Sequence, residues 1–322
     1  MRLYWTTAVA VCCLASIGVA VYANAKSIPS SIAATVLPAL LLESALYLAM
    51  AFPAVGSRLD ALSKWRKTGL LAASAIGPWL LLSGSANGLL LIALVVPVAA
   101  WYAMLPANRM TDLVLLLWLP AVVLMKGTLM RQIYPDAMPG VRVDFLGHLM
   151  WIRLSFGVMT LLRHAGRLEF GLLPSRSEIR AGVKWFLVGL PMAAAAGYGL
   201  GILRLGTPKA ALWQLPLYAV GALIGVYCVV ALSEEFFLRG LVFEWFRDVF
   251  GSAKHALAAT TFVSAAVHLW FRSAFNWKFA LCSAVLHYCF GRAYLEAQSV
   301  RAGMVAHALT VTAWLMVFGK SG

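Results

Sequence analysis

The chain has 322 residues, of which 62% are hydrophobic and only 12% are charged, and its mean hydropathy is +0.84. A soluble globule of this length needs more polar surface, so the composition excludes one and predicts a polytopic membrane protein. The formal net charge of +14 does not indicate nucleic-acid binding, because the basic residues lie in short loops between apolar runs. The positive-inside rule and anionic lipid headgroups account for such a distribution.

The first apolar run follows Arg2 and ends in Ala23-Asn24-Ala25, which imitates the cleavage site of a signal peptide. We expect a retained first span, with a cleaved leader as the alternative. Further spans of this half are predicted at residues 32–55, 69–83, 88–105 and 112–130. The loop after the second span is the strongest cytoplasmic marker in the chain. Its charged residues are Arg58, Asp60, Lys64, Arg66 and Lys67.

Charged and imidazole side chains interrupt the apolar segment 143–167, which either crosses the membrane or lies in its interface. The stretch 168–180 is the longest polar one. We therefore place a boundary between an N-terminal transmembrane bundle of unknown role, residues 1–167, and a C-terminal module, residues 168–322. Spans of the module are predicted at residues 182–203, 211–238, 256–270, 278–295 and 302–318. The predicted fold is all-α, a transmembrane helix bundle of about ten or eleven spans.

The segment S-E-E-F-F-L-R-G, residues 233–240, places charges at the end of an apolar run. On a helix Glu235 and Arg239 share a face at the spacing of an ion pair, whereas Glu234 lies about 100° around the axis. An ionised group at mid-bilayer depth costs about 2.5 to 3.5 kcal/mol, so acidic residues there tend to face a wet cavity and to act on something. The alternative is a charged belt at a helix end.

Two histidines stand where chemistry could use them, His268 in S-A-A-V-H-L-W and His307 in G-M-V-A-H-A-L-T. Either one alone is more typical of a core group held by hydrogen bonds. Together with Glu234 and Glu235 they match the requirements of amide hydrolysis. A glutamate in apolar surroundings can act as general base toward water, while a histidine donates to the developing oxyanion.

A zinc site is the rival interpretation, since Glu and His are also ligands of catalytic zinc. No H-E-x-x-H occurs, and the candidate ligands are scattered over three helices, so we predict neither a metal nor another cofactor. The sequence contains no G-x-S-x-G motif, so it gives no sign of a serine nucleophile. We interpret His287 and Glu43 as groups with structural hydrogen bonds. The cysteines lie in apolar runs as small core residues, at positions Cys12, Cys13, Cys228, Cys282 and Cys289.

The motif E-E-F-F-L-R at residues 234–239 resembles the E-E-x-x-x-R motif of the CAAX-protease and bacteriocin-processing family of intramembrane proteases, which includes the type II CAAX prenyl endopeptidases. His268 falls about one helix later, as the second motif of that family requires, and His307 matches the histidine of its last motif. The segment that leads to His307 is also similar to the corresponding segment of the family. It reads F-G-R-A-Y-L-E-A-Q-S-V-R-A-G-M-V-A-H, residues 290–307. The resemblance extends over roughly residues 168–318.

This resemblance implies a helical membrane endopeptidase of the glutamic type, with its site in a cavity open toward the cytoplasm. Position by position, Glu234 would activate the water with His268, Glu235 would orient His307, Arg239 would brace the glutamates, and His307 would help to hold the oxyanion. The implied partners are the lipid bilayer and a membrane-associated protein or peptide substrate, with no nucleic acid.

Two positions depart from the family pattern. Ser264 stands four residues before His268, where the family usually has Phe, and Phe262 is nearby. Val311 stands four residues after His307, where the family usually has Asn, and a valine side chain cannot donate a hydrogen bond. Thr310 is a possible substitute donor.

The predicted function is therefore intramembrane hydrolysis of a peptide bond, near the C-terminus or the membrane-adjacent segment of the substrate. A proteolytically inactive scaffold or chaperone is the second hypothesis, favoured by Val311, and a transporter is the third. The predicted location is a cell membrane, specifically a bacterial inner membrane. Counting spans from the basic loop puts Glu234, Glu235 and Arg239 at the cytoplasmic end of their helix.

Overall fold

The computed structural model describes residues 1–82, 126–162, 171–203, 214–270 and 275–317, with the single positions 91, 95, 104, 108 and 111. This part of the chain is helical and contains no β-strand, as predicted. Six of its helices are long and apolar enough to cross a membrane. The chain is a multi-pass membrane protein. The spans predicted at 88–105 and over most of 112–130 fall outside the described residues, and the total of ten or eleven stays a prediction.

The chain divides into two compact units. The first comprises Met1–Ala165 with Glu169–Leu172, and the second comprises Leu173–Gly322 with Gly166–Leu168. The assignment of an unknown role to residues 1–167 and of a protease module to residues 168–322 stays a prediction.

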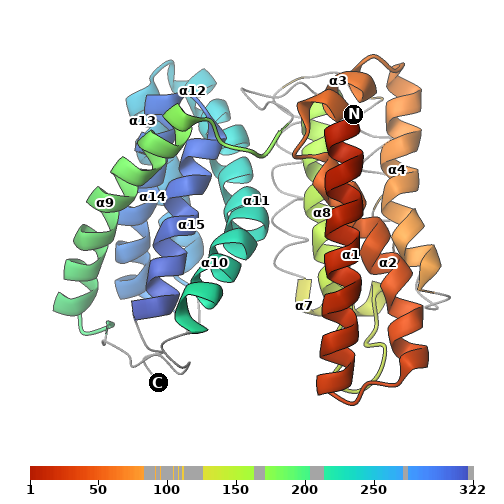
Figure 1. Ribbon diagram of the computed structural model, residues 1–322. Helices are drawn as coiled ribbons and strands as arrows, with labels where there is room; N and C mark the ends of the chain where they lie inside the picture. The colour runs from red at the N-terminus through yellow and green to blue at the C-terminus, as the bar shows by residue number, and fades with distance from the viewer. Residues whose placement is uncertain are drawn as a thin grey trace. The chain divides into compact units, whose positions relative to one another are not determined.

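The first unit is a bundle in which α1 packs on α2, α2 packs on α4, and α8 contacts both α2 and α4 (Figure 1). The segment 143–167 has two predicted placements, across the membrane or in its interface. Its residues Asp144–Leu162 form a mostly buried helix that is long and apolar enough to cross. The helices of this unit are α1 (Arg2–Ala25), α2 (Ser30–Ala49), α3 (Pro53–Asp60), α4 (Lys64–Leu81), α7 (Lys126–Ile133) and α8 (Asp144–Gly157).

A buried ion pair joins α2 to α8 in this bundle. The Nε and Nη2 atoms of Arg153 donate to the two carboxylate oxygens of Glu43, both at 2.9 Å. The Nη1 and Nη2 atoms also donate to the hydroxyl and the carbonyl oxygen of Ser74 on α4, at 2.7 and 2.9 Å. The structural role predicted for Glu43 is confirmed, because its carboxylate ties two helices together through one guanidinium.

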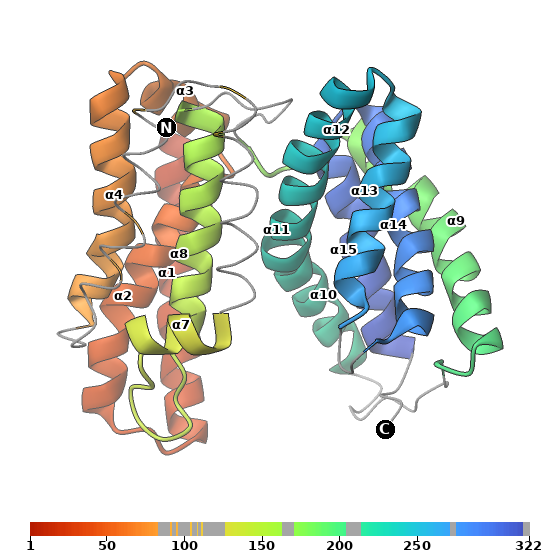
Figure 2. The ribbon, with the colours of Figure 1, turned by 180° about the vertical axis from the view of Figure 1, so that it is seen from behind.

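The second unit places α14 and α15 against α9, with α13 packed on α14 and α15 packed on the long helix that contains α11 (Figures 1 and 2). A capping box starts α9, in which the hydroxyl of Ser175 accepts from the backbone N–H of Glu178 at 3.4 Å. The helices are α9 (Arg176–Gly199), α10 (Leu215–Gly225), α11 (Leu232–Glu235), α12 (Phe243–Phe250), α13 (Ala253–His268), α14 (Trp277–Ala297) and α15 (Val300–Val317).

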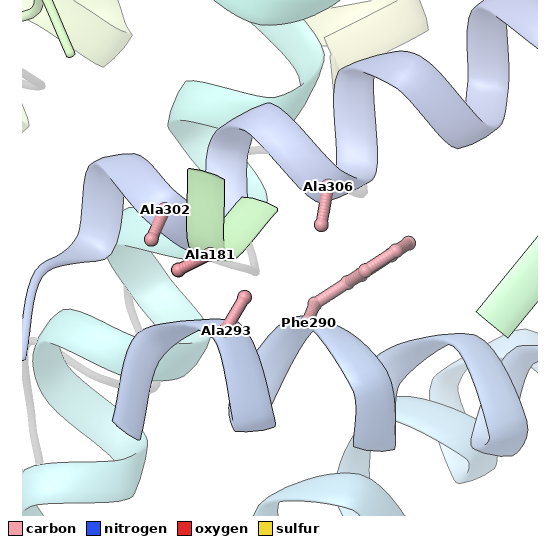
Figure 3. Close-up of a cluster of buried hydrophobic side chains, with 5 residues drawn as sticks. All are labelled: Ala181, Phe290, Ala293, Ala302 and Ala306. Carbon is pink, nitrogen blue, oxygen red and sulfur yellow. The ribbon is translucent and has the colours of Figure 1, made fainter. Parts of the chain in front are cut away.

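Small side chains let α9, α14 and α15 approach closely. Figure 3 shows the cluster at which they meet, which consists of Ala181, Phe290, Ala293, Ala302 and Ala306. Beside it, a Cβ atom added at Gly182 would lie 2.6 Å from the side chain of Val305. Small residues at such contacts are typical of membrane helices, where tight packing replaces the hydrophobic effect. This packing sets the rotation of α14 and α15 about their axes.

The long helix differs from the prediction. The span predicted at 211–238 ended too early, because α10, α11 and α12 are parts of one helical stretch from Leu215 to Phe250. The charged segment 233–240 ends the apolar run, but the segment F-E-W-F-R-D-V-F at 243–250 is strongly amphipathic and continues the helix. The helix ends where Gly251 adopts a left-handed conformation with φ of 62°. Glu234 and Glu235 therefore lie inside the helix rather than at its end.

Candidate active site

The paired glutamates lie on α11, a short α-helical turn between two π-helical segments, Val226–Ala231 and Phe236–Val242. Such insertions in a helix often occur at functional sites. The two carboxylates have different surroundings, because neighbouring residues of a helix point about 100° apart. Glu235 is completely buried, whereas the side chain of Glu234 is 39% exposed.

Arg239 neutralises Glu235 and links it to α14. Its Nη1 atom donates to Oε1 of Glu235 at 3.0 Å and to Nδ1 of His287 at 3.1 Å, while Nη2 donates to the backbone carbonyl of His287. The predicted ion pair between Glu235 and Arg239 is thus present at the predicted spacing. The guanidinium is buried, so these contacts replace its hydration shell.

His307 on α15 lies between the two glutamates. Its Nδ1 atom is 2.9 Å from Oε1 of Glu235, and its Nε2 atom is 3.9 Å from Oε2 of Glu234. The imidazole stacks on the ring of Phe290, with centroids 4.7 Å apart and planes 13° from parallel. One carboxylate and one aromatic face therefore hold the orientation of His307.

His268 is the last residue of α13, and its Nδ1 atom donates to the carbonyl oxygen of Ser264 at 2.7 Å. Its ring centroid is 5.3 Å from that of His287. Glu234, His268 and His287 each offer one carboxylate oxygen or ring nitrogen, and these three atoms all lie within 4.8 Å of one another.

The structure thus brings the five residues singled out by the sequence into one network on three helical segments. Glu234, Glu235 and Arg239 come from the long helix, His268 from α13 and His307 from α15. Their catalytic roles stay predictions.

Sequence reasoning missed two members of this network, both on α14. His287 was assigned only structural hydrogen bonds, and Phe290 was not considered. The available signal was their spacing of three residues, which places an imidazole and an aromatic ring on one face of the helix. His287 does form the expected hydrogen bonds, but within the site.

Glu234, His268 and His287 are sufficient in number for a catalytic metal site, which typically uses three protein ligands. The hydrogen bond of His287 does not suit such a site. Since a guanidinium can only donate, Arg239 makes Nδ1 of His287 an acceptor, and the ring keeps its proton on Nε2. A histidine that binds a metal through Nε2 needs the opposite arrangement, with a proton on Nδ1 that is donated to a hydrogen-bond partner.

At the two departures from the family pattern, the hydroxyl groups of Ser264 and Thr310 bond within their own helices. The hydroxyl of Ser264 donates to the carbonyl of Thr260 at 2.8 Å, and its own carbonyl accepts from His268. The hydroxyl of Thr310 donates to the carbonyl of Ala306 at 2.8 Å, so its proton is used within α15. Thr310 is therefore not a substitute for the donor that Val311 lacks.

Comparison with known families gives one match. Residues 216–313 match the model of a family described as type II CAAX prenyl endopeptidase Rce1-like. This match supports the resemblance of the C-terminal unit to the CAAX-protease family. The match begins in α10 and ends in α15, so it includes all five predicted site residues and His287. It implies a protease that acts on a membrane-associated protein. No significant match to a curated protein or to a solved structure was found.

Proposed function

We propose that the chain is an intramembrane endopeptidase of the glutamic type. One observation supports this proposal most directly. The accessible carboxylate of Glu234 lies beside His268 and His307, next to the buried hydrogen bonds of Glu235 and Arg239. The carboxylate and one atom of His268 lie within 4.8 Å of each other, and Nε2 of His307 is 3.9 Å from the carboxylate. An accessible base beside fixed imidazoles is the arrangement that water activation requires.

In the first step Glu234 takes a proton from water, with His268 holding that water. The water oxygen forms a bond to the carbonyl carbon of the substrate, and the π electrons of the carbonyl group move onto the carbonyl oxygen, which becomes the oxyanion. Glu234 then gives its proton to the amide nitrogen as the C–N bond breaks. The products are one carboxylic acid and one amine, and the carboxylate of Glu234 is restored.

Glu235, Arg239 and His307 support this step. Glu235 accepts from Nδ1 of His307 and so fixes the ring near the developing oxyanion, to which the doubly protonated ring can donate from Nε2. Arg239 compensates the charge of Glu235, which lets a carboxylate remain buried one residue from the base.

The proposed location is a bacterial inner membrane, with the site open toward the cytoplasm and with ten or eleven spans in total. The substrate is a membrane-associated protein or peptide that is cut near its C-terminus or beside the membrane. The N-terminal bundle, residues 1–167, would admit or select that substrate. The basic loop that contains Arg58 and Arg66 supports this orientation.

Replacing the base tests the proposal. In the purified full chain in lipid nanodiscs, Glu234→Gln should lower cleavage of an internally quenched, farnesylated CAAX peptide by about 10²- to 10⁴-fold. The control is Glu296→Gln, which removes a carboxylate of a surface pair with Lys184 and should leave cleavage unchanged. The same comparison is made in cells by mass spectrometry of the new C-termini of membrane proteins. Equal cleavage by Glu234→Gln and the parent protein would overturn the proposal.

Chelation tests whether cleavage proceeds without a metal ion. We expect cleavage to survive exhaustive dialysis against a chelator, because the hydrogen bond from Arg239 leaves His287 unsuited as a ligand. The measurement is activity together with zinc content of the same sample. Zinc in a one-to-one ratio whose removal abolishes cleavage would contradict the expectation.

An inactive membrane scaffold is the second candidate, and Val311 is the observation that favours it. Loss of one oxyanion donor typically costs about 10²- to 10³-fold in rate, so an enzyme lacking only that donor would be slow rather than inactive. Absence of cleavage in both assays, with no cellular effect of Glu234→Gln at unchanged protein abundance, would favour the scaffold.

A further inference from the structure

The three histidines of the site differ in which ring nitrogen carries the proton. His268 contacts a backbone carbonyl through Nδ1, and His307 contacts a carboxylate through Nδ1. Carbonyl and carboxylate oxygens accept hydrogen bonds, so each ring donates from Nδ1. In their neutral forms both rings therefore have an unprotonated Nε2, which accepts and cannot donate.

His287 has the opposite tautomer. Its Nδ1 atom faces the guanidinium of Arg239 at 3.1 Å, and a guanidinium has donors only. Nδ1 therefore accepts, and the proton of the neutral ring is on Nε2. Of these three imidazoles, His287 is the one whose neutral form presents an N–H group through Nε2.

Its surroundings fix this ring. Arg239 binds both the imidazole and the backbone carbonyl of the same residue, so the side chain and the main chain of His287 are held by one guanidinium. The ring also contacts Phe290 edge-on, with centroids 5.4 Å apart, and is buried. A donor held in this way costs no reorganisation when charge develops beside it.

The ring also lies beside the groups that would activate the water. His287 lies 5.3 Å from His268 and 5.9 Å from His307, measured between ring centroids, and one of its nitrogens lies within 4.8 Å of the Glu234 carboxylate. A carbonyl group attacked by water beside Glu234 would thus lie among these rings. Neither Val311 nor Thr310 on α15 supplies a proton there, because Val311 has no donor and the hydroxyl of Thr310 is bound within its helix.

We propose that His287 donates from Nε2 to the oxyanion and replaces the amide donor that Val311 removes from α15. This inference rests on the proposed proteolytic function. The oxyanion hole would then be built from α14 as well as α15, and this chain would be an altered protease rather than an inactive one. The required group is a neutral imidazole, so donation by His287 needs no protonation of the site.

A double-mutant cycle tests the donor role with the quenched farnesylated peptide in nanodiscs. His287→Leu should lower kcat by about 10²- to 10³-fold, and His287→Gln, whose amide both accepts from Arg239 and donates, should remain within about tenfold of the parent. Val311→Asn should change the parent by less than about tenfold but should restore much of the activity lost in His287→Leu. The control on the same helix is Ser283→Ala, which removes a buried hydroxyl without a partner in the described part of the chain and should leave cleavage unchanged.

The tautomer is tested without any substrate. Nitrogen NMR of the ¹⁵N-histidine-labelled full chain, which has six histidines, should include the signals of a ring with a protonated Nε2 and an unprotonated Nδ1 that disappear in His287→Gln. A protonated Nδ1 at His287 would overturn the inference even if the enzyme is active.

The kinetic outcomes separate the two proposals. If neither the parent nor any variant cleaves in either assay, the proteolytic function fails. If Glu234→Gln is inactive but His287→Leu cleaves like Ser283→Ala, the function stands and the donor role fails. If His287→Leu is inactive and Val311→Asn does not restore it, His287 only positions Arg239, and the donor role fails as well. Zinc that is bound by the parent and lost in His287→Leu would make His287 a ligand and would also overturn the inference.

Discussion

Each unit of the protein contains a buried arginine paired with a buried glutamate, but the two pairs are bonded differently. In the N-terminal unit both oxygens of Glu43 accept from Arg153, and the remaining contacts of the guanidinium go to Ser74. In the C-terminal unit a single oxygen of Glu235 accepts from both Arg239 and His307. The second oxygen is buried without a hydrogen-bond partner among the described residues.

This difference separates a pair that only joins helices from a pair that leads into the candidate site. The contacts of Arg153 and Glu43 join three helices and lead to no exposed group among the residues that the structure describes. The pair of Arg239 and Glu235 continues through His307 toward Glu234, whose side chain is 39% exposed. An unevenly bonded carboxylate is costly to bury, and such costs are typically retained where a site needs them.

Removing each arginine would give the largest effects. Arg153→Leu and Arg239→Leu should each destabilise the protein by about 3 to 5 kcal/mol, because a buried carboxylate is left without its partner. Only Arg239→Leu should also abolish cleavage per folded molecule, since His287 and Glu235 lose their common donor. Thermal unfolding in detergent, with activity normalised to folded protein, measures both quantities. Equal loss of normalised activity in the two variants would refute the distinction between the pairs.

Replacing both members of a pair sharpens the comparison. Glu43→Leu combined with Arg153→Met should recover the stability lost in Arg153→Leu, because well-packed apolar residues are neutral or stabilising by about 1 to 4 kcal/mol relative to a buried ion pair. Glu235→Leu combined with Arg239→Met should recover stability to a similar extent but should remain inactive. Recovery of cleavage by the second combination would show that Glu235 is not required to orient His307.

A smaller effect is expected from closing the space beside Glu235. A Cβ atom at Gly303 would lie 2.7 Å from Oε2 of Glu235, so Gly303→Ala must displace the carboxylate or shift α15. We expect a cost of about 1 to 3 kcal/mol and a loss of about 10- to 100-fold in cleavage. The control is Gly225→Ala on the long helix, where a Cβ atom would meet nothing within 4 Å. If both variants cleave equally, the position of Glu235 does not depend on this close contact.

Local helix geometry explains what was predictable about the site. The ion pair between Glu235 and Arg239 follows from their spacing of four residues, and the different exposure of Glu234 follows from its rotation of about 100°. The end of the long helix was not predictable in the same way. The predicted span ended at residue 238, whereas the amphipathic segment 243–250 continues the helix to Phe250.

The participation of α14 depended on packing between helices. His287 and Phe290 share a helix face in any α-helix, but whether that face meets Arg239 and His307 depends on how α14 is rotated against its neighbours. Ala181, Ala293 and Ala302 set this rotation by letting the backbones approach. No pattern within one segment contains that information, because the contacts join residues far apart in the chain.

The sequence by itself determined the all-helical membrane class and the residue types of the candidate site, since both follow from apolar content and from motifs of short spacing. Only the tertiary structure decided which ring nitrogen carries the proton in His287 and His307, because each tautomer is set by the partner of Nδ1. For His268 that partner is the carbonyl of Ser264 within the same helix, but for His287 and His307 it comes from another helix. The direction of each hydrogen bond is thus a property of the packed bundle, whereas the presence of three histidines is a property of the chain.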